Sequence, residues 1–252
     1  MRRPLLSPGA LVLAGSRGGV DPVAAYAGVS HKGLIELRGV TLVTRVLQAL
    51  NGAGITRIGV STNDRAVCDE VAGEAQILTA SDGPSRSVLG GAEKMGTPLL
   101  VTTSDHALLR PEWVAQFLTD APKDCDIAIL LAPEHLVRAA APNTKRTYLK
   151  FADGRYSGCN LFLLRNDNAL KAIHFWRRVE GLRKQPWRIA LLIGPGFLLA
   201  YLSGRMSLAQ TVARLGQKAG VKAAAVTSIY GLAAVDVDKP SDLDLVRELV
   251  RG

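Results

Sequence analysis

Asp105 stands where a parallel sheet would place a ligand. Residues 98–103 are largely apolar and predict a buried strand, which ends at Ser104 and Asp105. Open α/β sheets bind their ligands beyond the carboxyl ends of the strands. A carboxylate there can hold a divalent cation that bridges triphosphate oxygens, since Mg²⁺ prefers oxygen ligands. An N-cap role is disfavoured because the next predicted helix begins only at Pro111.

Two further carboxylates, Asp236 and Asp238, lie two positions apart on a segment predicted to be extended. Side chains at that spacing face the same side of an extended chain. Like charges that close together need a counterion, and a metal ion shared with Asp105 would provide it. For either residue alone, a structural alternative has equal weight, in which Asp238 or Ser241 only caps the final helix.

A glycine-rich loop follows the first predicted strand. The apolar run 10–14 leads into Gly15-Ser-Arg-Gly-Gly19, and Lys32 follows in Ser30-His-Lys-Gly33. Such a loop lets backbone N–H groups approach phosphate oxygens, and a lysine adds a mobile positive charge. The loop matches neither G-x-G-x-x-G nor G-x-x-x-x-G-K-[ST], so two common nucleotide-binding folds lose support. Taken alone, a plain glycine turn is an equal alternative.

Alternating strands and helices along most of the chain predict an α/β fold with a mostly parallel sheet and right-handed crossovers. The predicted strands after the first are 55–61, 76–79, 98–103 and 126–131, and the predicted helices are 39–50, 64–72, 85–94 and one that begins at Pro111. Residues 147–151 and 156–164 predict a small antiparallel excursion over the sheet. The C-terminal part, 169–216, is predicted to be helical and basic, followed by a strand at 221–226 and a closing helix.

Length and composition favour one folded domain over residues 1–252, without internal repeats. Apolar residues make up 48% of the chain and charged residues 21%, which is typical of a globular protein. The three cysteines are far apart, which excludes a disulfide framework or zinc motif and predicts buried, reduced thiols. The N-terminal residues predict a strand and not a cleavable signal, so we expect a cytoplasmic protein.

The net charge of +9 favours polyanionic partners, either nucleic acid, anionic lipid or phosphorylated small molecules. Nucleic acid is not expected, because aromatic residues are only 5% of the chain. A basic stretch from Trp176 to Arg205 contains the apolar run 189–201, which is too short to span a bilayer. We expect most of its apolar residues to be buried within the domain. A membrane-surface site, a lipid-precursor acceptor site and a homodimer contact are the alternatives.

In their order along the chain, four segments resemble the MobA-like NTP transferases of the GT-A-type nucleotidyltransferase superfamily. They are Leu13-Ala-Gly15, His31 to Gly39, Thr103 to Leu109 and Asp236 to Leu243. This superfamily includes molybdenum-cofactor, methylerythritol-phosphate and sugar-phosphate nucleotidyltransferases. The resemblance implies a three-layer, Rossmann-like (GT-A-type) α/β fold. It also implies transfer of NMP from an NTP, with CTP or GTP favoured, to a phosphorylated acceptor with release of pyrophosphate.

The resemblance assigns roles by position. Lys32 and Asp105 would be catalytic, and Asp105 with Asp236 or Asp238 would hold Mg²⁺ or Mn²⁺. Because 82–88 resembles a segment that lines base and ribose, the nucleotide-binding set would be Ala14, Gly15, Ser16, Arg17, Lys32, Arg86, Ser87 and Ser104. Lys150 and Asn160 would bind the acceptor, with a solvated basic hairpin and a structural asparagine as the alternative. His31 and His106 are expected to be structural.

This sequence departs from the family pattern in the glycine loop, where Arg17 comes early and Asp21-Pro22 occupies the later part.

Two other functions stay open at this point. A GT-A-like glycosyltransferase would bind a nucleotide-sugar and release a nucleoside diphosphate, although Lys32 fits a leaving triphosphate better. A non-catalytic nucleotide- or membrane-surface-binding module is the second.

Overall fold

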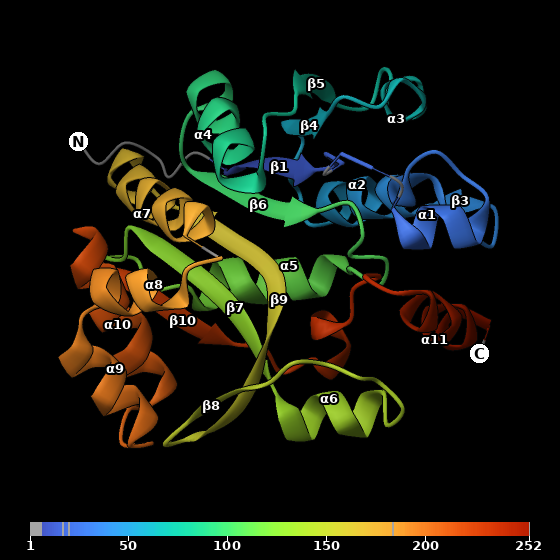
Figure 1. The fold of residues 1–252 in the computed structure, drawn as a ribbon. Coiled ribbons are helices and arrows are strands. Elements are labelled where there is room, and N and C mark those ends of the chain that lie inside the picture. The colour runs from blue at the N-terminus through green and yellow to red at the C-terminus, as the bar shows by residue number, and fades with distance from the viewer. Residues whose placement is uncertain (1–6, 17, 20, 183, 252) are drawn as a thin grey trace.

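The structure is a computed structural model that describes residues 7–16, 18–19, 21–182 and 184–251. Its centre is an eight-stranded sheet in the order β10-β7-β9-β6-β1-β4-β5, with β8 paired to β9 (Figure 1). The strands are β1 (Gly9–Leu13), β4 (Ile58–Thr62), β5 (Gln76–Thr79), β6 (Leu99–Thr103), β7 (Ile127–Pro133), β8 (Leu149–Phe151), β9 (Gly154–Leu164) and β10 (Ala223–Thr227). Neighbours β6, β1, β4 and β5 are parallel, as are β7 and β10, which confirms the predicted mostly parallel sheet.

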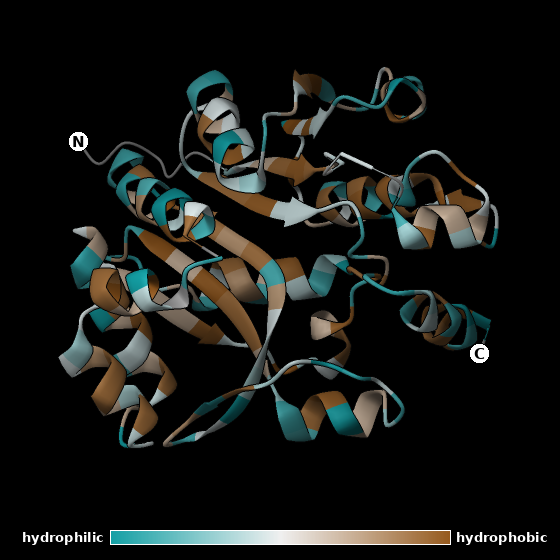
Figure 2. Ribbon diagram, viewed as in Figure 1, coloured by the Kyte–Doolittle hydropathy of each residue, from teal (hydrophilic) through white to brown (hydrophobic). Residues whose placement is uncertain are grey.

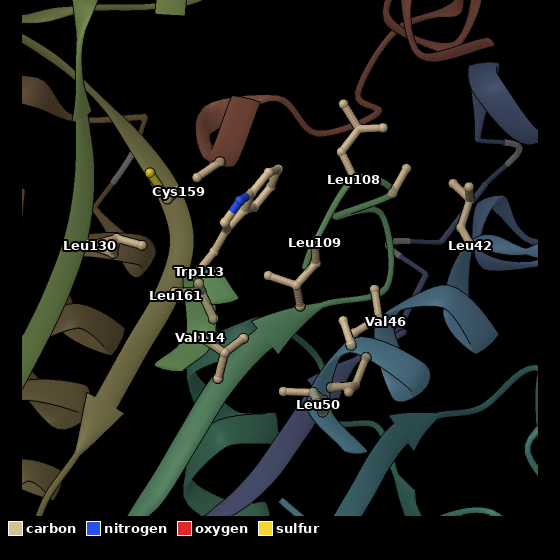
Figure 3. Close-up of a cluster of buried hydrophobic side chains, with 14 of the residues drawn as sticks. Leu42, Val46, Leu50, Leu108, Leu109, Trp113, Val114, Leu130, Cys159 and Leu161 are labelled. Atoms are coloured by element: carbon tan, nitrogen blue, oxygen red, sulfur yellow. The ribbon is translucent and has the colours of Figure 1, made fainter. Parts of the chain in front are cut away.

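Helices cover both faces of the sheet because its strands present apolar side chains alternately to each side. Val12 of β1 packs in one buried cluster with α2 (Leu42–Gly52) and α5 (Pro111–Asp120). Leu11 packs in a second cluster with α4 (Pro84–Met95) and α7 (Leu170–Gly181). Figure 3 shows part of the first cluster, and Figure 2 shows hydrophobic colour along the central strands. The three-layer α/β architecture is therefore confirmed.

Several helices begin at the residues that the sequence favours. Asp21 caps α1 (Pro22–Ala27), Asp64 caps α3 (Arg65–Glu70), and Pro111 opens α5 as predicted. The predicted helix at 39–50 begins later, at Leu42, because Glu36–Leu37 (β2) and Val40–Thr41 (β3) form a small antiparallel ribbon. Two helices, α1 and α6 (Glu134–Ala140), were not predicted. The remaining helices are α8 (Pro186–Ile193), α9 (Pro195–Leu202), α10 (Leu208–Ala219) and α11 (Pro240–Arg251).

Strand β9 lies inside the main sheet and not over it. It runs antiparallel to β6 on one side and to β7 on the other, and only β8 with the first residues of β9 extends as a ribbon. The second half of β9, Leu161 to Leu164, is apolar at every position. Such a segment buries both of its faces best between two other strands. The antiparallel excursion is therefore shorter than predicted, because most of β9 belongs to the main sheet.

The apolar residues of α8 and α9 are not buried, so our prediction for this stretch is wrong. None of residues 187–193 and 195–202 is buried. The reason is that α10 already covers this part of the sheet, with Leu208 and Val212 packed on Leu131 of β7. Tyr201 of α9 reaches the same cluster through an edge contact with Phe151. No helix in the described ranges is long and apolar enough to cross a membrane.

Candidate active site

The glycine loop and Asp105 begin side by side at one edge of the sheet. The N–H of Ala14 donates to the carbonyl of Ser61 at 2.9 Å, and the N–H of Ser104 donates to the carbonyl of Leu13 at 3.0 Å. Beyond these bonds, Gly15 and Ser16 are exposed and Ser104 is buried. The two strand ends therefore carry the predicted phosphate loop and the predicted metal ligand to the same place.

Lys32 is paired with Asp105, 73 positions later in the sequence. Its Nζ also lies 3.4 Å from Oδ1 of Asp238. A 3₁₀ turn, Lys32–Leu34, presents the lysine, and His31 caps this turn by accepting the N–H of Gly33 on Nδ1 at 2.9 Å. The structure thus brings together three of the predicted residues from distant segments.

Both members of this pair stay charged although they are largely shielded from water. Burial by itself disfavours the charge on either side chain, but the attraction and hydrogen bond between them outweigh it. The pKa of Lys32 is therefore raised and the pKa of Asp105 is lowered from their ordinary values. The second carboxylate oxygen of Asp105, Oδ1, is buried and has no hydrogen-bond partner among the described residues.

Asp236 is held by two side chains, of which Arg146 was not predicted. The guanidinium of Arg146 pairs with Oδ1 of Asp236, and the amide of Asn160 donates to Oδ2. The N–H of Val237 donates to the carbonyl of Asp105 at 3.1 Å, which ties the two acidic segments together. Burial raises the pKa of Asp236 to about 6, against the opposing effect of Arg146.

Asn160 reaches Asp236 from a bulge in β9. The register between β7 and β9 shifts between Ile129 and Leu131, and Asn160 has a left-handed backbone with φ of 50°. Bulges redirect a side chain at the expense of regular pairing. Asn160, predicted as an acceptor contact, therefore orients a carboxylate in this structure.

Asp236 and Asp238 are not equivalent, in contrast to the prediction that they face one side together. Asp236 is buried, whereas the side chain of Asp238 is 58% exposed. Their counterions among the described side chains are Arg146 for Asp236 and Lys32 for Asp238. The turn before α11 is held by Asp242, whose Oδ2 accepts the N–H groups of Asp238 and Lys239.

His106 is a buried, neutral side chain beside the site. Burial lowers its pKa to about 4, and its ring lies 6.3 Å from that of Trp113. His31 also has a lowered pKa because of burial, consistent with a neutral ring that accepts a hydrogen bond. Both histidines thus fit the structural role that we expected.

The carboxylates Asp105, Asp236 and Asp238 could hold a metal ion only together with other ligands. In the part of the chain that the structure describes, no group of three or more His, Cys, Asp or Glu side chains could hold one. Mg²⁺ is commonly bound by one or two carboxylates together with substrate phosphates. The unpaired Oδ1 of Asp105 is one such oxygen.

The sequence matches the MobA-like NTP transferase domain over residues 10–225. The chain belongs to the MobA-like NTP transferase family. Membership makes it a nucleotidyltransferase enzyme that takes a nucleoside triphosphate and a small-molecule acceptor. None of the curated proteins matches the sequence significantly.

Solved structures support this membership. A hypothetical transferase from Thermus thermophilus is 34% identical, with a TM-score of 0.83 over 94% of this chain and 100% of that one. A CMP:2-keto-3-deoxy-manno-octonic acid synthetase in complex with CTP is 17% identical, with a TM-score of 0.57 over 96% and 98% of the two chains. A 2-C-methyl-D-erythritol 4-phosphate cytidylyltransferase, also from Thermus thermophilus, is 16% identical, with a TM-score of 0.57 over 98% and 100%. The last two share the fold.

In this MobA-like NTP transferase, three other predicted residues make no ion pair or hydrogen bond with Asp105, Asp236 or Asp238 within the described ranges. Arg86 is exposed and pairs with Asp82 at 3.4 Å, and Ser87 is buried and accepts the N–H of Ser81 at 3.0 Å. Lys150 is exposed on β8. Arg17 falls outside the described residues.

Arg146 is the main site residue that sequence reasoning missed. It lies in the basic segment Asn143-Thr-Lys-Arg146, where nothing distinguishes it from the lysine beside it. The one signal in the sequence would have been that a buried carboxylate in the second acidic segment, such as Asp236, needs a cation as partner. That need does not specify which of many basic residues supplies it.

Proposed function

We propose that this enzyme transfers NMP from an NTP, CTP or GTP by preference, to a phosphorylated small molecule and releases pyrophosphate. The observation that carries the proposal is the position of Lys32, in contact with both Asp105 and Asp238 beside the exposed glycine loop. A lysine there suits a triphosphate whose two outer phosphates leave. Support for CTP comes from the similar fold of the synthetase that was solved with CTP.

The reaction is an in-line displacement at the α-phosphorus. A phosphate oxygen of the acceptor forms the new bond to the α-phosphorus, and the bond from that atom to the α–β bridging oxygen breaks. Pyrophosphate leaves with the electron pair, so no covalent enzyme intermediate is required. Positioning and charge neutralisation supply most of the acceleration in reactions of this type.

The protein's own groups prepare the site for an anion. Lys32 neutralises Asp105 and Asp238, and Arg146 neutralises Asp236. We propose that Lys32 exchanges these carboxylates for the triphosphate when NTP binds. The backbone N–H groups of Gly15 and Ser16 would bind phosphate oxygens, because these residues are exposed at the strand end.

Mg²⁺, or Mn²⁺ in its place, would be held by Asp105 and Asp236, with Asp238 at the rim, and would supply neutralisation of the phosphate charge. The unpaired Oδ1 of Asp105 fits this role. Asn160 and Arg146 would keep Asp236 in place. Lys150 is proposed for the acceptor phosphate, and the cytoplasm is proposed as the compartment, since NTPs are available there.

The test is to incubate the protein with CTP, GTP, ATP or UTP, Mg²⁺ and a pool of phosphorylated metabolites, and to follow pyrophosphate and product masses. We expect pyrophosphate with one NTP and a new NDP-linked compound. Asp105→Asn and Lys32→Met should each lower turnover by about 10²-fold or more. Asp124→Asn is the matched control, because Asp124 is an exposed carboxylate that makes a surface ion pair with Lys222, far from the assigned site in sequence.

Mg²⁺-dependent NTP binding is measured in the same samples, so that a missing acceptor is recognised. Failure to bind any of the four NTPs would contradict the proposal. Turnover of a nucleotide-sugar with release of a nucleoside diphosphate would instead establish the glycosyltransferase alternative. Normal turnover by Asp105→Asn would show that the assigned site is wrong.

A further inference from the structure

Helices α8 and α9 form an exposed apolar surface, which we call the α8–α9 surface. Its most exposed large side chains are Trp187 at 63%, Leu191 at 66%, Leu199 at 69% and Leu202 at 69%. Figure 2 shows hydrophobic colour on these helices at the outer edge of the molecule. Single exposed apolar residues are common, but several together on two consecutive helices indicate a binding surface.

The chain segment that carries this surface has charges of one sign. Residues 181–235 contain no Asp or Glu but seven Lys or Arg, namely Arg183, Lys184, Arg188, Arg205, Arg214, Lys218 and Lys222. Of these, Lys184, Arg188, Arg205, Arg214 and Lys218 are exposed. Within the described ranges, none of these five lies within 4.0 Å of a carboxylate. The surface therefore presents five exposed cations that make no ion pair within the described ranges.

A hollow between α9 and α10 combines both properties. It is lined by Phe197, Arg214, Gln217 and Lys218. Phe197 offers an apolar wall, and the two basic side chains and the amide offer hydrogen-bond donors. This lining suits a phosphate group attached to an apolar body.

We propose that the α8–α9 surface docks this enzyme on an anionic phospholipid bilayer. Apolar side chains with a tryptophan and a basic rim are typical of helices that lie in the membrane interface, where each basic residue adds attraction to anionic lipid. A second copy of this chain fits less well. In a two-fold symmetric dimer each patch meets its own copy, so the same unneutralised cations would face one another.

Docking in this way leaves the part of the candidate active site around Lys32 and Asp238 free. In Figure 1, α8 and α9 lie at the left of the molecule, whereas α1 and α11, which flank Lys32 and Asp238 in sequence, lie at the right. The bilayer would therefore lie away from Lys32 and Asp238. By contrast, β8, which carries Lys150, is in contact with α9 through Phe151 and Tyr201. Turnover of soluble substrates should not depend on the apolar side chains of the surface.

The experiment is co-sedimentation of the full chain with vesicles of phosphatidylcholine alone or with about one third phosphatidylglycerol, at low and at high salt. We expect binding to the anionic vesicles only, weakened by salt because the basic rim is solvent-exposed. Trp187 should also show a blue-shifted fluorescence on binding. Trp187→Phe should remove that shift, because Trp113 is buried and Trp176 is packed on Phe162, so neither should report on the bilayer. This variant should still co-sediment with the vesicles.

Two double variants test the two parts of the surface. Leu199→Glu with Leu202→Glu, and Arg214→Glu with Lys218→Glu, should each reduce vesicle binding about tenfold or more while the melting temperature and NTP binding stay unchanged. Ile229→Glu is the matched control, because Ile229 is 64% exposed outside this surface and should leave vesicle binding intact.

Absence of binding to anionic vesicles at low salt would overturn the proposal. Equal loss of binding in Ile229→Glu would overturn the assignment to this surface. The oligomeric state of the wild type and of the leucine variant is measured by sedimentation. A wild-type dimer that the leucine variant dissociates, without vesicle binding in either protein, would show that a second copy covers the surface instead.

Discussion

Arg146 pairs with Asp236, which lies 90 positions later in the sequence, and together with Asn160 it encloses that carboxylate on its buried side. Removing one partner of a buried ion pair leaves the other charge uncompensated. The pair therefore connects the stability of this region with the charge state of a proposed metal ligand.

For Arg146→Met we expect the pKa of Asp236 to rise further, because burial then acts without the opposing cation. Turnover at neutral pH should fall by about 10²-fold, through a weaker response to Mg²⁺ concentration. Arg146→Lys should recover part of this loss, because it restores the charge without the fork-shaped contact. The measurement is turnover against Mg²⁺ concentration at several pH values, and an unchanged Mg²⁺ response in Arg146→Met would contradict the assigned role.

The left-handed backbone of Asn160 gives a second prediction, which separates strain from hydrogen bonding. Asn160→Gly and Asn160→Ala both lose the amide that donates to Asp236, but only alanine must hold a side chain at φ of 50°. We expect the glycine variant to be more stable by about 1 kcal/mol and both to lose activity to a similar degree. Urea unfolding and turnover check this, and equal stability of the two variants would show that the bulge rearranges.

The raised pKa of Asp236 predicts how stability changes with pH in metal-free buffer. Its pKa is about 6 in the folded protein, against an ordinary value of 3.8. Between these values the folded state binds more protons than the unfolded state, so this contribution to the free energy of unfolding is lost as pH rises from 4 to 6. Asp236→Asn cannot titrate and should lack the slope, which is at most about 1.4 kcal/mol per pH unit.

Urea unfolding of wild type and Asp236→Asn in the presence of a chelator at pH 4, 5, 6 and 7 measures this difference. As the pH rises from 4 to 6, the free energy of unfolding of the wild type should fall relative to that of Asp236→Asn. Above pH 6 the two proteins should change in parallel. Parallel behaviour throughout the range would mean that Asp236 is already ionised at pH 4 in the folded protein.

Two adjacent glycines of α4 should respond in opposite ways to alanine. A Cβ at Gly90 would meet no atom within 4 Å, whereas a Cβ at Gly91 would overlap Cδ2 of the fully buried Leu11. Gly90→Ala should stabilise the protein by about 0.5–1 kcal/mol through helix propensity. Gly91→Ala should destabilise it by about 1–3 kcal/mol through overpacking. Thermal unfolding checks both, and a stable Gly91→Ala would show that β1 and α4 can separate.

Much of the fold could be predicted from local pattern. The bounds of β5, the start of α5 at Pro111 and the buried strand before Asp105 agree with the sequence predictions. The three cysteines are free as predicted, but only Cys125 and Cys159 are buried. Helix and strand periodicity and the conformational limits of proline act over a few residues, so they can be recognised in the sequence. The same holds for Lys32 and Asp105, whose family pattern is local.

Only the tertiary structure decided which distant residues meet. The place of β9 between β6 and β7 puts Asn160 beside Asp236, and the chain before β8 brings Arg146 to the same carboxylate. The exposure of α8 and α9 likewise follows from α10 covering the sheet first. These outcomes depend on strand order and on competition between segments for one buried surface, and neither is encoded in the spacing of neighbouring residues.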